Sequence, residues 1–140
     1  RALMDDALQE TYVKAYRALP RFRGESSLGT WLYRIAYNAS LDELKRTRQV
    51  VDLGSVRERA DQRPGLADAL SARQGLAAAF TLLTPVDRAT VWLVDALGFD
   101  YGRAAQVLDV PEGTVASRLN RARAVLRRAL DDQVEGVSQR

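Results

Sequence analysis

The strongest constraint on this fold is a proline, Pro111, that separates two short segments with helical apolar spacing within residues 101–126. The first segment carries its apolar residues on one side: Ala104, Ala105, Val107 and Leu108. A proline disfavours helical geometry in the residue before it but suits the first turn of a helix, so one helix ends and another begins here. The second segment repeats apolar residues at offsets of four, three and four: Val115, Leu119, Ala122 and Leu126. Two short helices with a tight turn predict a helix-turn-helix, whose second helix fits the major groove of DNA.

Positive charge gathers on the second of these helices. Five arginines lie outside its apolar stripe: Arg118, Arg121, Arg123, Arg127 and Arg128. Residues 114–130 contain no acidic side chain, although the net charge of the whole chain is only +3. Such sorting directs one face toward a polyanion. A solvated arginine-rich surface would give the same composition, and it is the preceding short helix and turn that favour DNA.

The composition argues against an enzyme. The 140 residues include no cysteine and no histidine, which removes thiolate metal ligands and the commonest general base. No glycine-rich phosphate loop, G-x-S-x-G elbow or carboxylate metal loop is present, so we expect no catalytic residue, no metal and no cofactor. No apolar run approaches the roughly 20 residues of a membrane span, and no signal peptide is visible, so a cytoplasmic location is expected. The chain opens with Arg1, so we expect that part of the N-terminus is missing.

The sequence predicts an all-α protein of two small helical domains joined by a linker. The expected parts are a first domain over 1–49, a linker over 50–72 with room for a short helix, a four-helix second domain over 73–130, and a frayed tail over 131–140. The linker prediction depends on mixed charge, two glycines, a proline and few large apolar groups. Its length and polarity indicate that the two halves fold separately.

Helix boundaries are marked by specific residues. In the first domain an amphipathic helix ends at Pro20, and Ser27 caps a second, longer helix. The inward face of the first helix is predicted from its apolar residues: Ala7, Leu8, Tyr12, Ala15, Tyr16 and Leu19. In the second domain, after a helix over 75–83, Thr84 caps a helix with proline at its first position. That helix is expected to reach residue 97 and end at Gly98, and Asp100 is expected to cap the helix-turn-helix.

Two motif blocks, in this order, resemble the extracytoplasmic-function (ECF) sigma factors of bacterial RNA polymerase. The block LQETYVKAYRALPRFRGESSLGTWLYRIAYNASLDELKR is similar to the family's regions 2.2 to 2.4, and LLTPVDRATVWLVDALGFDYGRAAQVLDVPEGTVASRLNRARAVLRRAL to its region 4. The run GTVASRLNRAR is the most specific part. The family places further helical sequence before the Q-E-T motif, where this chain has only RALMDDA. It also has an acidic residue, isoleucine and alanine where Arg103-Ala104-Ala105 stands here.

The resemblance implies a non-catalytic subunit that binds core RNA polymerase and promoter DNA, with an anti-sigma factor as a further partner. It implies four polymerase-binding residues on the first helix: Asp6, Gln9, Glu10 and Thr11. It assigns recognition of the minus-ten element to a loop and the helix after it: Arg23, Gly24, Glu25, Ser26, Arg34, Tyr37 and Asn38. Recognition of the minus-thirty-five element is expected from the start of the arginine-rich helix: Ala116, Ser117, Arg118, Asn120 and Arg121.

Two other functions fit parts of the sequence. A free-standing helix-turn-helix regulator would use only the second half and dimerise through the first, and would bind palindromic duplexes without polymerase. An adaptor that binds protein and no DNA is a third possibility, against which the arginine row argues. Co-purification with core polymerase separates the three functions.

Overall fold

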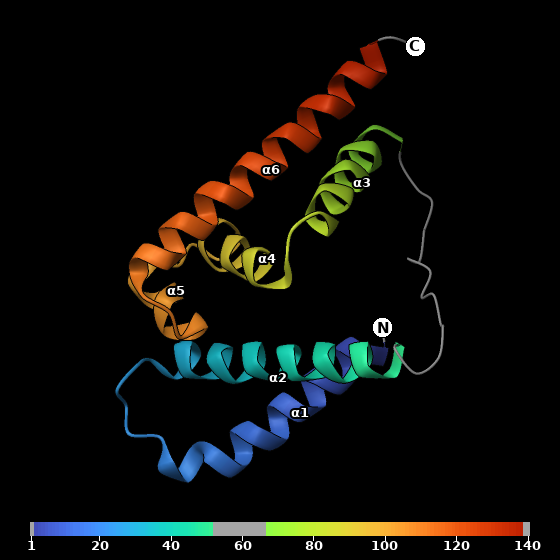
Figure 1. The fold of residues 1–140 in the computed structure, drawn as a ribbon. Coiled ribbons are helices and arrows are strands. Elements are labelled where there is room, and N and C mark those ends of the chain that lie inside the picture. The colour runs from blue at the N-terminus through green and yellow to red at the C-terminus, as the bar shows by residue number, and fades with distance from the viewer. Residues whose placement is uncertain (1, 52–66, 139–140) are drawn as a thin grey trace. The chain divides into compact units, whose positions relative to one another are not determined.

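In a computed structural model of the protein, residues 2–51 and 67–138 are described, and these residues form helices, turns and loops without a strand. The prediction of an all-α fold is confirmed. The chain divides into two compact units, residues 1–59 with 105–110, and residues 60–104 with 111–140. The first unit is built on α1 and α2 (Figure 1), and residues 105–110 are the end of α5, a helix that begins in the second unit, and the turn that follows it.

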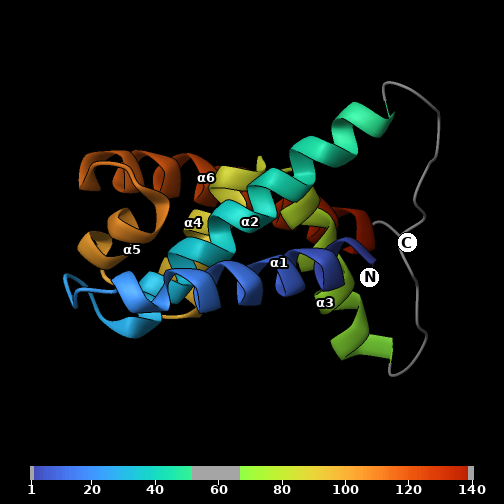
Figure 2. The ribbon, with the colours of Figure 1, turned by 90° about the horizontal axis from the view of Figure 1, so that it is seen from below.

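The first unit is a pair of helices joined by a short turn and a loop. Helix α1 spans Ala2–Ala18, a 3-10 turn η1 spans Leu19–Arg21, and α2 spans Leu28–Val51. Helix α1 lies along α2 in both views of the ribbon (Figures 1 and 2). The predicted cap of α2 is confirmed, because the amide of Thr30 donates to the Ser27 hydroxyl at 3.1 Å.

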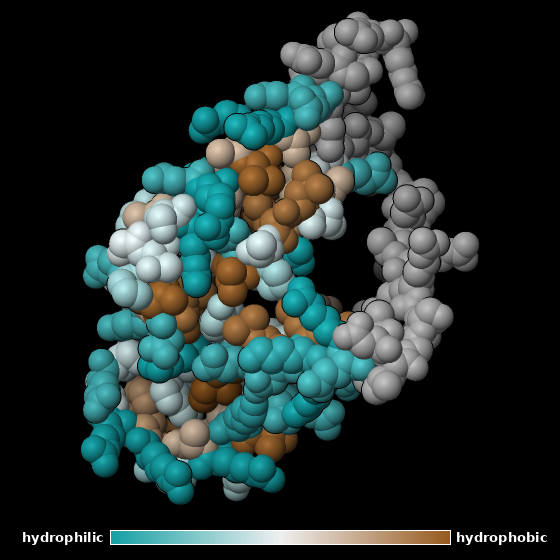
Figure 3. Space-filling model, in the orientation of Figure 1, coloured by the Kyte–Doolittle hydropathy of each residue, from teal (hydrophilic) through white to brown (hydrophobic). Residues whose placement is uncertain are grey.

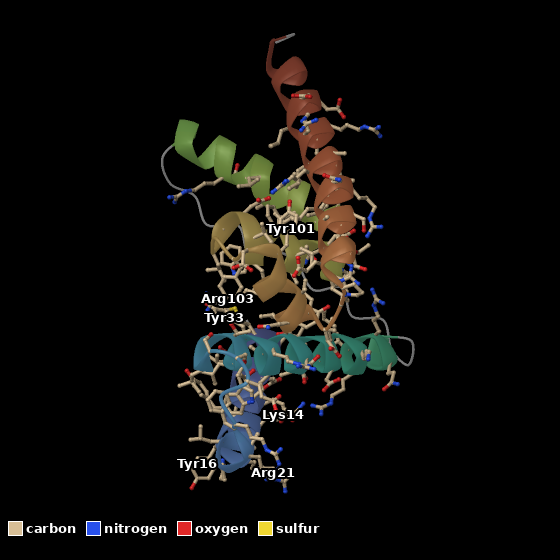
Figure 4. All side chains as sticks on the ribbon, turned by 90° about the vertical axis from the view of Figure 1, so that its left-hand side faces the viewer. Lys14, Tyr16, Arg21, Tyr33, Tyr101 and Arg103 are labelled. Atoms are coloured by element: carbon tan, nitrogen blue, oxygen red, sulfur yellow. The ribbon has the colours of Figure 1, made fainter. Side chains whose placement is uncertain are left out.

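The predicted inward face of α1 is wrong in its large residues. Leu8, Tyr12 and Tyr16 are 52%, 67% and 82% exposed, and Tyr16 points away from the helix pair in Figure 4. Thr11 is buried instead, and its hydroxyl donates to the carbonyl of Ala7 at 2.6 Å, which satisfies the polar group. The side of α1 that packs on α2 thus carries small side chains, with Ala7 and Ala15 half-buried on the same face as Thr11.

The second unit contains α3 (Ala67–Thr81), α4 (Pro85–Val91), a π-helical turn η2 (Trp92–Ala96), α5 (Tyr101–Leu108) and α6 (Glu112–Ser138). The buried apolar residues of this unit are Ala79, Leu83, Val91, Leu93, Phe99, Ala104, Val115, Leu119 and Ala122, and Ala105, Val107 and Leu108 at the end of α5 are buried as well. The predicted α6 stripe is confirmed, with Leu126 only half-buried at its end. In Figure 3 apolar side chains gather where α3 lies beside α6, and hydrophilic ones line α2.

Both predicted caps in this unit are present. Thr84 accepts a hydrogen bond from the amide of Asp87, and Asp100 accepts one from the amide of Arg103 at 2.7 Å. The turn of the helix-turn-helix has Asp109 in the left-handed region at φ 54°. There the amide of Val110 donates to the carbonyl of Ala105 at 3.1 Å, which caps the end of α5.

Three boundaries differ from the sequence prediction. The helix expected to reach residue 97 is α-helical only to Val91 and then widens into η2, where the amide of Leu97 bonds the carbonyl of Trp92 at 3.0 Å. Helix α3 begins at Ala67, inside the predicted linker, and residues 52–66 of that linker lie outside the described residues. The tail predicted to fray continues α6 to Ser138, since nothing in residues 131–138 is a proline that would break the helix.

Candidate nucleic-acid interface

The first turns of α6 present a polar surface on the side opposite the buried stripe. Ser117, Asn120 and Arg121 are exposed there, while Ala116 and Arg118 are half-buried. The Ser117 hydroxyl donates to the carbonyl of Thr114 at 3.0 Å. The five residues predicted to read DNA therefore share one end of α6, which is the end that a helix-turn-helix inserts into a groove.

Arg121 is held by a carboxylate from another helix. Its Nη2 donates to Oδ1 of Asp87 at 2.6 Å, and its Nε donates to Oδ2 of the same carboxylate at 3.1 Å. This is the side-on, two-bond geometry in which arginine binds carboxylates most specifically. The Asp87 side chain is 5% exposed, whereas that of Arg121 is 61% exposed. The ion pair thus joins a buried carboxylate on α4 to an exposed guanidinium on α6.

The electrostatics of Asp87 follow from its neighbours. Burial raises the pKa of the Asp87 carboxyl, but hydrogen bonds with Arg121 and Thr84 and the nearby charge of Arg118 outweigh burial and leave the pKa below its ordinary value. The Asp87 carboxyl is therefore ionised at neutral pH. Arg118 acts on Asp87 through its charge. The Nη1 atom of Arg118 is buried and has no hydrogen-bond partner among the described residues.

A second arginine of α6 is paired in the same way. Arg123 donates from Nη2 and Nε to the two carboxylate oxygens of Asp95, at 2.6 and 3.1 Å. Both side chains are partly exposed. Residue Ala122, between the two arginines, is fully buried. Two of the five arginines outside the apolar stripe, only one of them predicted to read DNA, are therefore also contacts between elements of the unit.

The loop that joins η1 to α2 lines a hollow in the first unit. Predicted residues Arg23, Glu25 and Ser26 lie around it with Arg34 of α2. Gly24 at the tip of the loop has φ +73°, a conformation that favours glycine. A hollow that combines guanidinium groups with polar side chains suits a nucleotide taken out of its stack.

Sequence reasoning missed part of this hollow. Arg21, Phe22 and Thr30 also line it, and the ring of Phe22 packs on that of Trp31 at 5.1 Å between centroids. Phe22 opens the loop of residues 22–27 that was expected to read the minus-ten element, although it was not among the named site residues. The predicted residues Tyr37 and Asn38 lie further along α2 and do not line the hollow. Arg21 projects outward at the end of η1 in Figure 4.

The four α1 residues predicted to bind polymerase do not share one surface. Asp6 and Gln9 are exposed, and Glu10 is half-buried with a carboxylate oxygen 3.5 Å from Nζ of Lys14. Lys14 also bonds Asp42 of α2 at 3.0 Å, and this hydrogen bond lowers the pKa of the Asp42 carboxyl. Thr11 faces α2 instead of solvent.

Within the part of the chain that the structure describes, no three potential metal ligands cluster. None of the helices described there is long and apolar enough to cross a membrane.

Comparisons with known proteins match both units. A model of sigma-70 region 2 matches residues 1–50, and a model of sigma-70 region 4 matches residues 73–126. The ECF RNA polymerase sigma factor SigM of Mycobacterium tuberculosis is 37% identical over 137 residues, which cover 96% of this chain and 67% of that protein. The chain belongs to the ECF RNA polymerase sigma factors. The ECF RNA polymerase sigma-E factor of Escherichia coli K12 is 33% identical over 148 residues, covering 96% of this chain and 75% of that one.

Two solved structures share the fold. The sigma factor RpoE from Bartonella quintana, solved with the anti-sigma factor NepR, has a TM-score of 0.71 and 28% identity, and the match covers 91% of this chain and 80% of that chain. CnrH, solved with the cytosolic domain of CnrY, has a TM-score of 0.62 and 29% identity, over 91% and 71%. As a sigma factor, the protein is a transcription initiation factor, and the resemblance read from its motifs is confirmed.

Proposed function

We propose that this sigma factor binds core RNA polymerase through α1 and directs it to promoters by contacting DNA with both regions, without catalysing a reaction itself. The observation that carries the proposal is the presence of region 2 and region 4 in one chain, each with its own polar or basic surface. The match of residues 1–50 to region 2 disfavours the alternative of a free-standing helix-turn-helix regulator, which needs no such region. Residues 50–72 are proposed to link the two DNA-binding domains.

Region 2 is proposed to hold the minus-ten element. Opening DNA exposes unstacked bases, which need a polar and aromatic recess to replace stacking and pairing. The hollow beside α2 supplies guanidinium groups and the Phe22 ring, and Asn38 on the next turns of α2 offers an amide for a base edge. The proposed residues are Arg23, Gly24, Glu25, Ser26, Arg34, Tyr37 and Asn38.

Region 4 is proposed to read the minus-thirty-five element with the first turns of α6. Asn120 suits adenine, whose N6 and N7 match an amide, and Arg121 suits guanine. Arg118 and Ser117 are placed to contact phosphates, with Ala116 beside them. Phosphate contacts fix the position of the helix, and base contacts then select the sequence.

Regulation by a protein partner is proposed from the surface of region 4 and from the similar structures. Leu82 and Trp92 are 64% and 55% exposed, large apolar side chains that a protein partner could cover. Both similar solved structures hold the matched protein with a second protein, and in the Bartonella quintana structure these are a sigma factor and an anti-sigma factor. We propose that an anti-sigma partner holds this factor and releases it in response to a signal. The released factor then acts in the cytoplasm, at a set of promoters specific to that signal.

The polymerase-docking part of the proposal is tested by changing two exposed residues of α1. Asp6→Ala with Gln9→Ala is expected to weaken binding to core polymerase about tenfold, which corresponds to about 1.4 kcal/mol. Neither side chain is buried, so helical content should not change. Asp131→Ala with Asp132→Ala, two exposed acidic residues of α6, is the matched control and should bind as wild type. Equal affinity of all three proteins would place the docking surface elsewhere.

A further inference from the structure

The contact between Arg121 and Asp87 leaves a defined part of the guanidinium unused. Arginine carries five N–H donors in one plane, and they can be grouped as a side-on pair on Nε and one terminal nitrogen and an end-on pair on the two terminal nitrogens. Asp87 accepts from Nε and Nη2, which is the side-on pair. The end-on pair, from Nη1 and the second hydrogen of Nη2, lies at the outer end of a side chain that is 61% exposed.

Burial and a helix cap hold Asp87 in place. Its side chain is 5% exposed, and its residue lies in the first turn of α4, where the amide donates to the Thr84 hydroxyl. A free arginine side chain loses rotamer freedom when it is fixed. Fixing the guanidinium before DNA arrives reduces the entropy lost on binding. The buried Asp87 carboxylate therefore fixes the orientation of an exposed and otherwise flexible Arg121 side chain.

We propose that Asp87 is a positioning residue for promoter recognition, which holds Arg121 so that its end-on pair of donors faces guanine O6 and N7 in the minus-thirty-five element. Guanine is the base whose major-groove edge offers two adjacent acceptors to such a fork. The inference rests on the proposed reading of the minus-thirty-five element by Arg121.

Arg118 supports the same assignment. It is half-buried near the Asp87 carboxylate, and its charge helps to keep that carboxylate ionised. Without Asp87, Arg118 and Arg121 would be like charges one turn apart on α6, which repel each other. The Arg121 guanidinium would then swing outward toward any phosphate, and base selection would weaken while the positive charge remained.

A different role predicts a different result. If Asp87 only competed with DNA for Arg121, its removal would free a cation and tighten binding to every sequence alike. If Asp87 served the fold alone, its removal would weaken binding to every sequence in proportion to the loss of folded protein. Of the three roles, only positioning of Arg121 by Asp87 changes the preference for one base at a single position of the minus-thirty-five element.

The test uses polymerase holoenzyme and a promoter library randomised across the minus-thirty-five element. Arg121→Ala should reduce the preference for one guanine, by about 5-fold to 150-fold for the loss of one bidentate base contact. Asp87→Asn should reduce the preference at the same position, by about tenfold. Adding Asp87→Asn to Arg121→Ala should reduce it no further, because the acid acts through the arginine. Asp95→Asn, which removes the partner of Arg123, is the matched control and should leave the preference unchanged.

Tighter or weaker binding by Asp87→Asn at every sequence, with its base preference intact, would overturn the positioning role. Unchanged preference in Arg121→Ala would instead overturn the proposed base contact itself, so the two failures are distinct. Arg121→Lys is the second variant, because it leaves Asp87 a cationic partner but has no planar fork. It should relax the preference at the same guanine and keep the fold, and a preference equal to wild type would also contradict the proposal.

Discussion

Arg123 and Asp95 repeat the geometry of Arg121 and Asp87, with the same pair of distances, 2.6 and 3.1 Å. The two pairs differ in the exposure of the acid, which is 38% for Asp95 and 5% for Asp87. Solvent screens an exposed ion pair, whereas a buried carboxylate depends on its partners to replace the lost water. Region 4 therefore contains two ion pairs of the same geometry that contribute unequally to the free energy of unfolding.

This difference predicts unequal costs for one chemical change. Asp95→Asn should lower the free energy of unfolding of region 4 by about 0.2–1 kcal/mol, as exposed pairs do. Asp87→Asn should lower it by about 1.5–3 kcal/mol, the range for hydrogen bonds to charged groups. Hydrogen exchange read by mass spectrometry gives the stability of each region separately in the full chain. Equal costs would show that burial of Asp87 does not set the strength of its pair.

The lowered pKa of Asp87 predicts acid sensitivity of region 4. A carboxyl that binds its proton less tightly in the folded state than in the unfolded state adds stability above its ordinary pKa of 3.8. That stability is lost as the pH falls through the lowered folded-state pKa. The melting temperature of region 4 should therefore fall between roughly pH 5 and pH 3, and fall less in Asp87→Asn. A fall of the same size in both proteins would mean that other groups carry the effect.

Two glycines of region 4 should respond in opposite directions to the same substitution. Gly98 has φ +72°, and Gly113 lies in the first turn of α6, and neither has an atom within 4 Å of where a Cβ would stand. Gly98→Ala should cost about 1–2 kcal/mol because the left-handed conformation disfavours a side chain. Gly113→Ala should add about 0.5–1 kcal/mol because alanine loses less entropy in a helix. Thermal melting of both variants beside wild type measures the two signs, and shifts of one sign would contradict the backbone argument.

Region 4 should unfold without region 2 when its core is charged. Leu119 is fully buried, and an unpaired charge there costs several kcal/mol, against roughly 5 kcal/mol for a small domain. Leu119→Asp should make residues 73–130 sensitive to protease while residues 1–49 stay resistant, as shown by mass analysis of the fragments. Ser117→Asp, an exposed position two residues earlier, is the control and should stay resistant throughout. Cleavage of both regions in Leu119→Asp would mean that they unfold as one unit.

The parts of this fold that were predictable are those set by neighbours in sequence. Pro111 and the spacing of Val115 and Leu119 located the helix-turn-helix, because local geometry and periodicity decide both. Thr84 and Asp100 marked helix starts for the same reason: a cap bonds an amide three residues on.

What the sequence could not show depends on distant partners. Arg121 and Asp87 are 34 positions apart, and nothing in their surroundings tells that they pair. Tyr12 and Tyr16 looked like an inward face, yet α2 packs on the side of Thr11. The site residues of region 2 were placed by resemblance, and the structure added Arg21 and Thr30 to the hollow beside α2.

Sigma-factor activity is measured directly by transcription with purified core RNA polymerase, with and without this protein. A library of promoter fragments serves as template, and the start sites of the transcripts are sequenced. We expect transcripts only when the protein is present, from starts preceded by shared minus-ten and minus-thirty-five elements. We also expect that the protein elutes with core polymerase on a sizing column. Binding to duplex DNA without association with core, and no start that depends on the protein, would contradict sigma-factor activity.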